Sequence, residues 1–257
     1  MINKKKTIIL SGSSKGVGFE IAKLFNKNRF NLILIARNFE KEFLKKFNYM
    51  DNVFLISSAI EDKLVTKKIN QILKENKLLS PSIIINNSGG PDPIPPLNLD
   101  EEKLDSYLNS GLKGFIRIIK EYSPNMIENK WGRILNIGST VSKEPSAIMA
   151  TSATVRAALN AYSKALSLDL APHGITVNTI NLGGVFTDRI QTLFKKIADA
   201  EKVSTTKKIK EAEASIPMKR FAKPEEVAYL IDFLCSRKAD YITGQIISID
   251  GGLSKSI

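Results

Sequence analysis

Seven short apolar runs alternate along the chain with longer segments in which apolar residues recur at helical spacing. The runs hold Ile, Leu and Val at consecutive positions, so both faces of each predicted strand are apolar. Such strands are typical of a parallel sheet that helices cover on both faces. The predicted strands are 7–11, 31–36, 53–57, 82–86, 132–138, 175–181 and 245–250.

The segments between these strands carry the helical pattern. The predicted helices are 16–28, 62–76, 100–129, 150–171 and 224–236. Because alternating strands and helices are joined by right-handed crossovers, the pattern predicts a doubly wound, mostly parallel, Rossmann-like α/β sheet with helices on both faces. We expect one dinucleotide-binding domain over 1–257, with a helical lid at about 185–222, where the alternation breaks after the sixth strand.

The composition fits a globular α/β domain and excludes several other classes. Of the 257 residues, 43% are hydrophobic and 25% are charged. A single cysteine, Cys235, cannot form an internal disulfide, and with a single histidine, His173, it predicts no metal site. The apolar run 8–10 near the N-terminus is too short for a signal peptide or a membrane span. We therefore expect a cytoplasmic protein with no membrane partner.

The net charge of +12 raises the question of an anionic partner. It comes from 38 basic and 26 acidic residues, and the lysines are spread along the chain without a basic stripe interleaved with aromatics. This distribution favours a solvated lysine-rich surface over a nucleic-acid interface. A basic surface also suits phosphates or an acidic carrier protein.

A glycine-rich loop follows the first predicted strand in the sequence SGSSKGVGFEIA. Glycines let the chain turn sharply and approach a pyrophosphate, and the next helix offers amide hydrogens and the positive end of its dipole. A tight turn without a ligand is the alternative. We predict that the loop binds a dinucleotide through Gly12, Ser14, Lys15, Gly16, Val17 and Gly18.

The end of the second predicted strand indicates which dinucleotide binds. A site for NAD(H) wants an acidic residue there, whereas this chain has Arg37, which pairs instead with a 2′-phosphate. Lys15 in the glycine loop supports the same interpretation. The two residues predict NADP(H) over NAD(H), and two ordinary surface cations are the alternative.

These segments together resemble the short-chain dehydrogenase/reductase family over essentially the whole chain. The resemblance rests on the glycine loop, NNSG (86–89), GRILNIGS (132–139) and the segment 173–188, and the tail 220–252 is similar to that of 3-oxoacyl carrier-protein reductases. It implies an active-site serine at Ser139. It also implies cofactor contacts from Asn87, Gly89, Arg156, Gly183 and Thr187.

The chain departs from the family where the catalytic Tyr-x-x-x-Lys pair is expected. Thirteen residues after Ser139 stands Ser152, four further stands Arg156, and none of the six tyrosines has lysine four residues on. The family's helix asparagine corresponds to Gly111, and its aspartate after the third strand corresponds to Ala59. KEP (143–145), Arg156 and TDR (187–189) are similar to a divergent, reductase-like branch that lacks the tyrosine.

The replacement pair cannot perform the chemistry of tyrosine and lysine. A serine hydroxyl ionises far less readily than a tyrosine, and arginine stays protonated. Three hypotheses remain: a reductase in which Ser139 and Arg156 stabilise charge while water supplies the proton, redox on a substrate whose proton step is easy, and a non-catalytic dinucleotide-binding protein or regulatory subunit. A capping role for Ser152 and a surface salt bridge for Arg156 are the structural alternative.

Two further segments and the resemblance bear on substrate and assembly. GPDPIPP (90–96) forms either a wall of the cofactor crevice or a plain connector. The lid lysines hold an anionic substrate, such as a carrier-protein thioester, or form a solvated helix face. They are Lys195, Lys196, Lys202, Lys207, Lys208 and Lys210. The resemblance implies a small-molecule carbonyl substrate and a homodimer or homotetramer formed through 100–129, 150–171 and the last strand.

Overall fold

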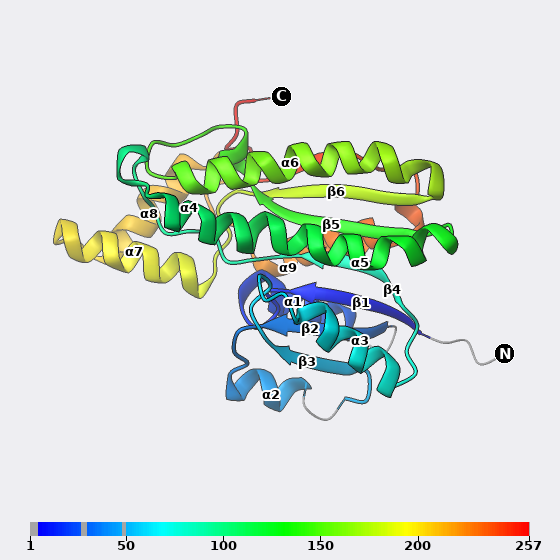
Figure 1. The fold of residues 1–257 in the computed structure, drawn as a ribbon. Coiled ribbons are helices and arrows are strands. Elements are labelled where there is room, and N and C mark those ends of the chain that lie inside the picture. The colour runs from blue at the N-terminus through cyan, green and yellow to red at the C-terminus, as the bar shows by residue number, and fades with distance from the viewer. Residues whose placement is uncertain (1–4, 27–29, 48–49, 257) are drawn as a thin grey trace.

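A seven-stranded parallel sheet forms the centre of the protein in the computed structural model, which describes residues 5–26, 30–47 and 50–256 (Figure 1). The strand order is β3-β2-β1-β4-β5-β6-β7, and every neighbouring pair is parallel. All seven predicted strands and the doubly wound α/β class are confirmed. The strands are β1 (Lys6–Ser11), β2 (Phe30–Ala36), β3 (Val53–Ser57), β4 (Pro81–Asn86), β5 (Gly132–Ser139), β6 (Ile175–Leu182) and β7 (Ile246–Ile249).

Alternating side chains of the strands supply two separate cores. In β1, Ile8 and Leu10 lie in the core on one face, whereas Ile9 lies in the core on the other. Helices α1 (Gly16–Phe25), α2 (Lys41–Phe47) and α9 (Pro224–Cys235) cover the first face. Helices α3 (Val65–Glu75), α5 (Gly114–Glu128) and α6 (Ala150–Leu170) cover the second. Burial on both faces explains why the strands are apolar at consecutive positions.

The observed helices match the predicted helices only in part. Helix α2 was not predicted, the segment 100–129 is divided by a π-helical turn at Asn109–Lys113, and the predicted residues 27–28 of the first helix lie outside the described residues. The helices are α1 (Gly16–Phe25), α2 (Lys41–Phe47), α3 (Val65–Glu75), α4 (Glu101–Leu108), α5 (Gly114–Glu128), α6 (Ala150–Leu170), α7 (Asp188–Glu201), α8 (Thr205–Ser215) and α9 (Pro224–Cys235).

The segment between β6 and α9 is helical, as expected, and consists of α7 and α8. Both helices lie beyond the end of the sheet toward which the strand arrows point (Figure 1). Three rings of this segment pack together, since the ring centroid of Phe221 lies 6.2 Å from that of Phe186 and 5.8 Å from that of Phe194. The strand order reverses between β1 and β4. A ligand crevice is therefore expected at the carboxyl ends of these strands, the end of the sheet where α7 and α8 lie.

None of the described helices is long and apolar enough to span a membrane.

Candidate active site

The glycine loop after β1 is held against the end of β4. Its first residue, Gly12, adopts a positive φ of 59°, and its carbonyl oxygen accepts a hydrogen bond of 2.9 Å from Asn87 Nδ2. A Cβ at Gly18 would lie 2.0 Å from the Gly12 carbonyl oxygen. The turn and the first turn of α1 therefore touch backbone to backbone, and neither glycine tolerates a side chain.

The N-terminus of α1 faces the segment that follows β6. No side chain caps this helix at Lys15, so its first amides remain directed at the crevice. A Cβ at Gly16 would lie 3.1 Å from Thr187 Cγ2, which places Thr187 directly across the loop. These contacts form a cradle that fits a pyrophosphate, and they bring together residues that the sequence places 171 positions apart.

The two cations expected to select NADP(H) lie at the rim of this cradle. Arg37 directly follows β2 and is exposed, and no ion pair of Arg37 is recorded among the described residues. Lys15 is ion-paired with Glu40, whose hydrogen bond raises the pKa of the lysine. Sequence reasoning did not find Glu40, because a lone exposed carboxylate three residues after Arg37 carries no motif.

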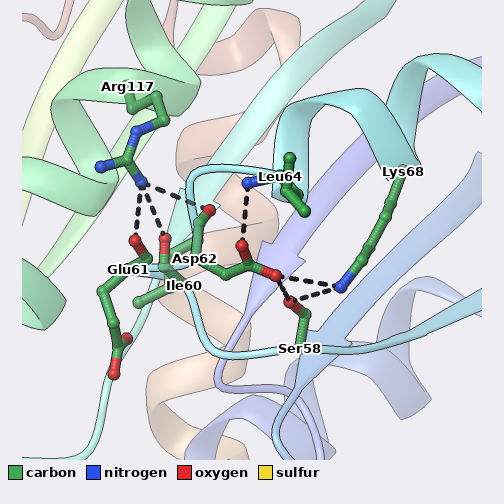
Figure 2. A network of polar contacts seen from close by, with 7 residues as sticks. All are labelled: Ser58, Ile60, Glu61, Asp62, Leu64, Lys68 and Arg117. Atoms are coloured by element: carbon green, nitrogen blue, oxygen red, sulfur yellow. Dashed lines mark hydrogen bonds and ion pairs between the residues drawn. The ribbon is translucent and has the colours of Figure 1, made fainter.

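A polar network fixes the loop that follows β3 (Figure 2). Arg117 of α5 donates to the carbonyl oxygens of Ile60 (3.4 Å), Glu61 (3.2 Å) and Asp62 (3.5 Å). The Asp62 carboxylate accepts from three donors: the Leu64 amide at 2.8 Å, the Ser58 hydroxyl at 2.7 Å and Lys68 Nζ at 3.0 Å. The loop at the carboxyl end of β3 is thus held from both sides.

Replacing Asp62 with asparagine should lower the melting temperature at pH 7 by a few degrees. The Leu64 amide, the Ser58 hydroxyl and Lys68 hold the pKa of Asp62 well below its usual range. A carboxyl whose pKa falls on folding stabilises the protein above its unfolded pKa of about 3.9, and that contribution is lost as the pH falls further. Thermal unfolding should show the same gap between the two proteins at pH 7 and pH 5 and a smaller gap at pH 3; a gap that is equal at all three pH values would contradict this assignment.

The candidate serine, Ser139, ends β5 and is held in a network of buried amides and hydroxyls. Its carbonyl oxygen accepts from Ser142 Oγ at 2.6 Å. That hydroxyl in turn accepts from Asn160 Nδ2 of α6 and Asn181 Nδ2 of β6, both at 2.8 Å. The turn that carries Ser139 is therefore tied to two neighbouring elements.

Ser152 and Arg156 lie on the buried face of α6, with exposed fractions of 4% and 5%. Arg156 Nη1 donates to Ile137 O at 3.0 Å, and Nη2 donates to Ser88 O at 3.3 Å and Ser88 Oγ at 3.1 Å. The alternative of a surface salt bridge for Arg156 is wrong, because the small-residue face of α6 packs closely enough to enclose the guanidinium.

Burial lowers the pKa of Arg156 to about 10, and the nearby positive charge of Arg189 contributes in the same direction. The side chain is still protonated at neutral pH, so it keeps a full positive charge inside the protein. Arg189, at the start of α7, donates from Nη2 to Pro91 O at 2.7 Å. A Cβ at Gly90 would lie 3.1 Å from its Nη1, so the guanidinium covers the Gly90 backbone.

A small pocket joins α6 to the loop after β4 and to the π-helical turn. Gly111 lies at this turn, and its Cβ would meet Val155 Cγ1 at 2.8 Å and Arg156 Nη1 at 3.9 Å. The sequence predicted three of the lining residues as site residues, and Ser88, Tyr107 and the neighbouring Arg189 were not assigned. The lining residues are Ser88, Gly89, Pro91, Tyr107, Ser110, Gly111, Ser152, Val155 and Arg156.

Gly183, a predicted cofactor contact, packs closely against the end of β7. Its Cβ would lie 2.7 Å from Asp250 Cβ, and its amide donates to Ile249 O at 2.9 Å. Close packing of β6 against the end of β7 therefore explains this glycine.

No group of three or more His, Cys, Asp or Glu side chains arranged to hold a metal ion occurs among the described residues.

Comparison with known proteins places this geometry in a family. The family described as Enoyl-(Acyl carrier protein) reductase matches residues 12–254. The NADPH-dependent reductase BacG of Bacillus subtilis is 35% identical, over 98% of this chain and 99% of that protein. The 3-oxoacyl-[acyl-carrier-protein] reductase FabG of Rickettsia conorii is 32% identical, over 96% of both chains.

A solved structure shows the same fold over the full chain. The crystal structure of YwfH, described as an NADPH dependent reductase involved in bacilysin biosynthesis, has a TM-score of 0.89 and 34% identity, covering 99% of this chain and 100% of that one. This chain belongs to the short-chain dehydrogenase/reductase family, as its motifs predicted.

Proposed function

We propose that this chain is an NADPH-dependent oxidoreductase that reduces a small carbonyl substrate with Ser139, Ser152 and Arg156 in place of a tyrosine–lysine pair. The observation that carries the proposal is the buried, protonated guanidinium of Arg156 in a pocket beside the cofactor cradle. The relatives support the redox class and the cofactor, since BacG is an NADPH-dependent reductase.

The cofactor would be held by the elements around the crevice. The glycine loop and the N-terminus of α1 fit the pyrophosphate, and Arg37 with Lys15 fits the 2′-phosphate. Asn87, Gly89 and Thr187 would border the nicotinamide half. NADPH supplies the hydride when it is bound.

The chain's own contribution is to stabilise negative charge on the substrate oxygen. A buried cation and hydroxyl donors that are fixed before the reaction can lower the barrier by about 3–4 kcal/mol. Arg156 is fixed by its bonds to Ile137 and Ser88, and Ser139 is fixed through Ser142. Because arginine does not release its proton near neutral pH, water would supply the proton to the product.

The finer features of substrate and assembly are also proposals. A 3-oxoacyl thioester fits the FabG relatives, and a free carbonyl compound fits the small pocket. The protein would form a homodimer or homotetramer in the cytoplasm. Light scattering of the purified protein tests the assembly, and a monomer would contradict it.

Calorimetry with NADPH and NADH tests the cofactor assignment directly. Wild-type protein should bind NADPH at least about tenfold more tightly than NADH, because a charge-assisted bond to phosphate contributes roughly 1.5–3 kcal/mol. Arg37→Asp should reverse this preference by removing the cation and offering an acceptor to the ribose hydroxyls. Unchanged NADPH affinity in Arg37→Asp would remove Arg37 from the site.

A panel of carbonyl compounds tests the redox step itself. NADPH oxidation with at least one carbonyl compound, reduced at least about 100-fold in Ser139→Ala, is the expected result. Tight NADPH binding without hydride transfer to any compound would support the non-catalytic alternative instead.

A further inference from the structure

Arg156 is a buried cation whose recorded partners are all neutral. Its hydrogen bonds go to the carbonyl oxygens of Ile137 and Ser88 and to the Ser88 hydroxyl. Among the ion pairs of the described residues, none involves Arg156. Burial of a charge without a counter-charge is costly, and proteins normally pair such a group or use it.

Arg133, a buried arginine of the sheet, has the usual carboxylate partner. Arg133 of β5 is fully buried, and it is ion-paired with Asp240 and hydrogen-bonded to the carbonyl oxygens of Gly132 and Ser236. The fold can therefore supply a carboxylate to a buried guanidinium. At Arg156, in contrast, the charge that acts on the guanidinium is the positive charge of Arg189, which lowers the pKa of Arg156.

Arg189 brings a second guanidinium next to the residues that line this pocket, from the side of α7. It donates to Pro91 O and lies against Gly90, and Pro91 and Gly89 line the pocket that contains Arg156. The positive charges of Arg156 and Arg189 repel each other, unless an anion lies between them. The remaining polar lining consists of the hydroxyls of Ser88, Tyr107, Ser110 and Ser152, and none of the described carboxylates lines the pocket.

We propose that Arg156 and Arg189 together bind a carboxylate of the substrate, so that the substrate class is a small carbonyl compound with a free carboxyl group. This inference rests on the proposed function and deepens it. A guanidinium has five N–H donors, and three acceptors are recorded for Arg156, so donors remain for substrate oxygens. The planar fork of arginine matches the two oxygens of a carboxylate, which favours a carboxylate over a rounder anion.

The inference separates two substrate types that the family resemblance leaves open. The acyl group of a thioester is uncharged, so it offers no negative charge to the two guanidinium groups. A free oxo acid instead brings one negative charge to the two guanidinium groups, in a pocket that Ser152 also lines. The pocket therefore predicts discrimination between an acid and its own ester.

The binding experiment uses the protein loaded with NADP, and malonate as a dicarboxylate that cannot be reduced at an activated carbonyl. Calorimetry should show malonate binding about 10- to 100-fold more tightly to wild type than to Arg189→Met. Arg237→Met serves as the matched control, because Arg237 is exposed on the turn after α9 and should leave malonate binding unchanged. Inorganic phosphate is the second probe and should bind more weakly than malonate.

The kinetic experiment compares 2-, 3- and 4-oxo acids with their methyl esters. Wild type should prefer at least one acid over its ester by about tenfold or more in kcat/KM, and Arg189→Met should lose that preference. Equal rates for acid and ester, or malonate binding that survives Arg189→Met, would overturn the inference. A fall in NADPH affinity in place of malonate affinity would overturn it too, by assigning Arg189 to the cofactor phosphates.

The two readouts keep this inference apart from the proposed function. If malonate binds as expected but no carbonyl compound is reduced, the anion site stands and the reductase proposal fails. If oxo esters are reduced as well as acids, the reductase proposal stands and the anion site fails.

Discussion

Replacing Arg156 with methionine should lower kcat/KM by about 100- to 1,000-fold and leave the protein at least as stable as the wild type. The loss of activity follows from removing the cation that, in the proposed function, stabilises the substrate oxygen. The gain or constancy in stability follows from burial, because the 5% exposed guanidinium has neutral partners in the folded protein. Replacement of buried ionic groups by apolar ones of similar size is often neutral or stabilising by about 1–4 kcal/mol.

Arg133→Met is the matched control for this prediction. It removes an equally buried arginine that is paired with Asp240 and bonded to Ser236 O, at the opposite end of the sheet. This variant should lower the melting temperature, because it breaks the pair and frees the turn after α9. Urea unfolding and initial rates on both variants make the comparison. An Arg156→Met protein that is inactive because it is unfolded, or active at the wild-type rate, would contradict the assignment.

Replacing Gly18 with alanine should weaken NADPH binding by at least about 100-fold and lower the free energy of unfolding by about 3 kcal/mol. The added Cβ would lie 2.0 Å from the Gly12 carbonyl oxygen and 2.8 Å from the Gly12 carbonyl carbon. Both neighbours are backbone, so the glycine turn and α1 must separate. Their separation moves the amides that face the pyrophosphate.

Gly89→Ala supplies the stability control for this clash. A Cβ at Gly89 would have Arg189 Nη1 at 3.8 Å as its nearest recorded neighbour, which is an ordinary contact. That variant should unfold at the wild-type midpoint. Calorimetry and thermal unfolding of both glycine variants decide the matter, and a Gly18→Ala protein with wild-type affinity and midpoint would show that the loop can rearrange freely.

The sequence predicted the sheet well because its signals are local. Apolar residues at consecutive positions mark strands such as β1 and β5 wherever they lie in the chain, and the glycine loop marks the first crossover. Helix α2 was missed because KEFLKKF has only seven residues, and its two buried phenylalanines, Phe43 and Phe47, pack against α1 rather than defining a long stripe.

The candidate site was predicted only where a motif existed. Ser152 and Arg156 follow from their spacing after Ser139, but their burial depends on how α6 packs on the sheet. Arg189 was noticed within TDR (187–189) without a role, because its contact with Pro91 joins positions that are 98 residues apart. Such long-range contacts between a side chain and a distant backbone carbonyl have no signature in a single sequence.

The close packing of Gly111 has a consequence for engineering this site back to the common family arrangement. An asparagine at position 111 would place its Cβ 2.8 Å from Val155 Cγ1 and close to the Arg156 guanidinium. The asparagine would therefore compete for volume with Val155. A variant with tyrosine at 152 and lysine at 156 would still have glycine at 111, where the resemblance places the family's asparagine. We therefore expect residues 111, 152 and 156 to be coupled, so that variants that change one of the three at a time are less active than either the wild type or a variant that changes all three.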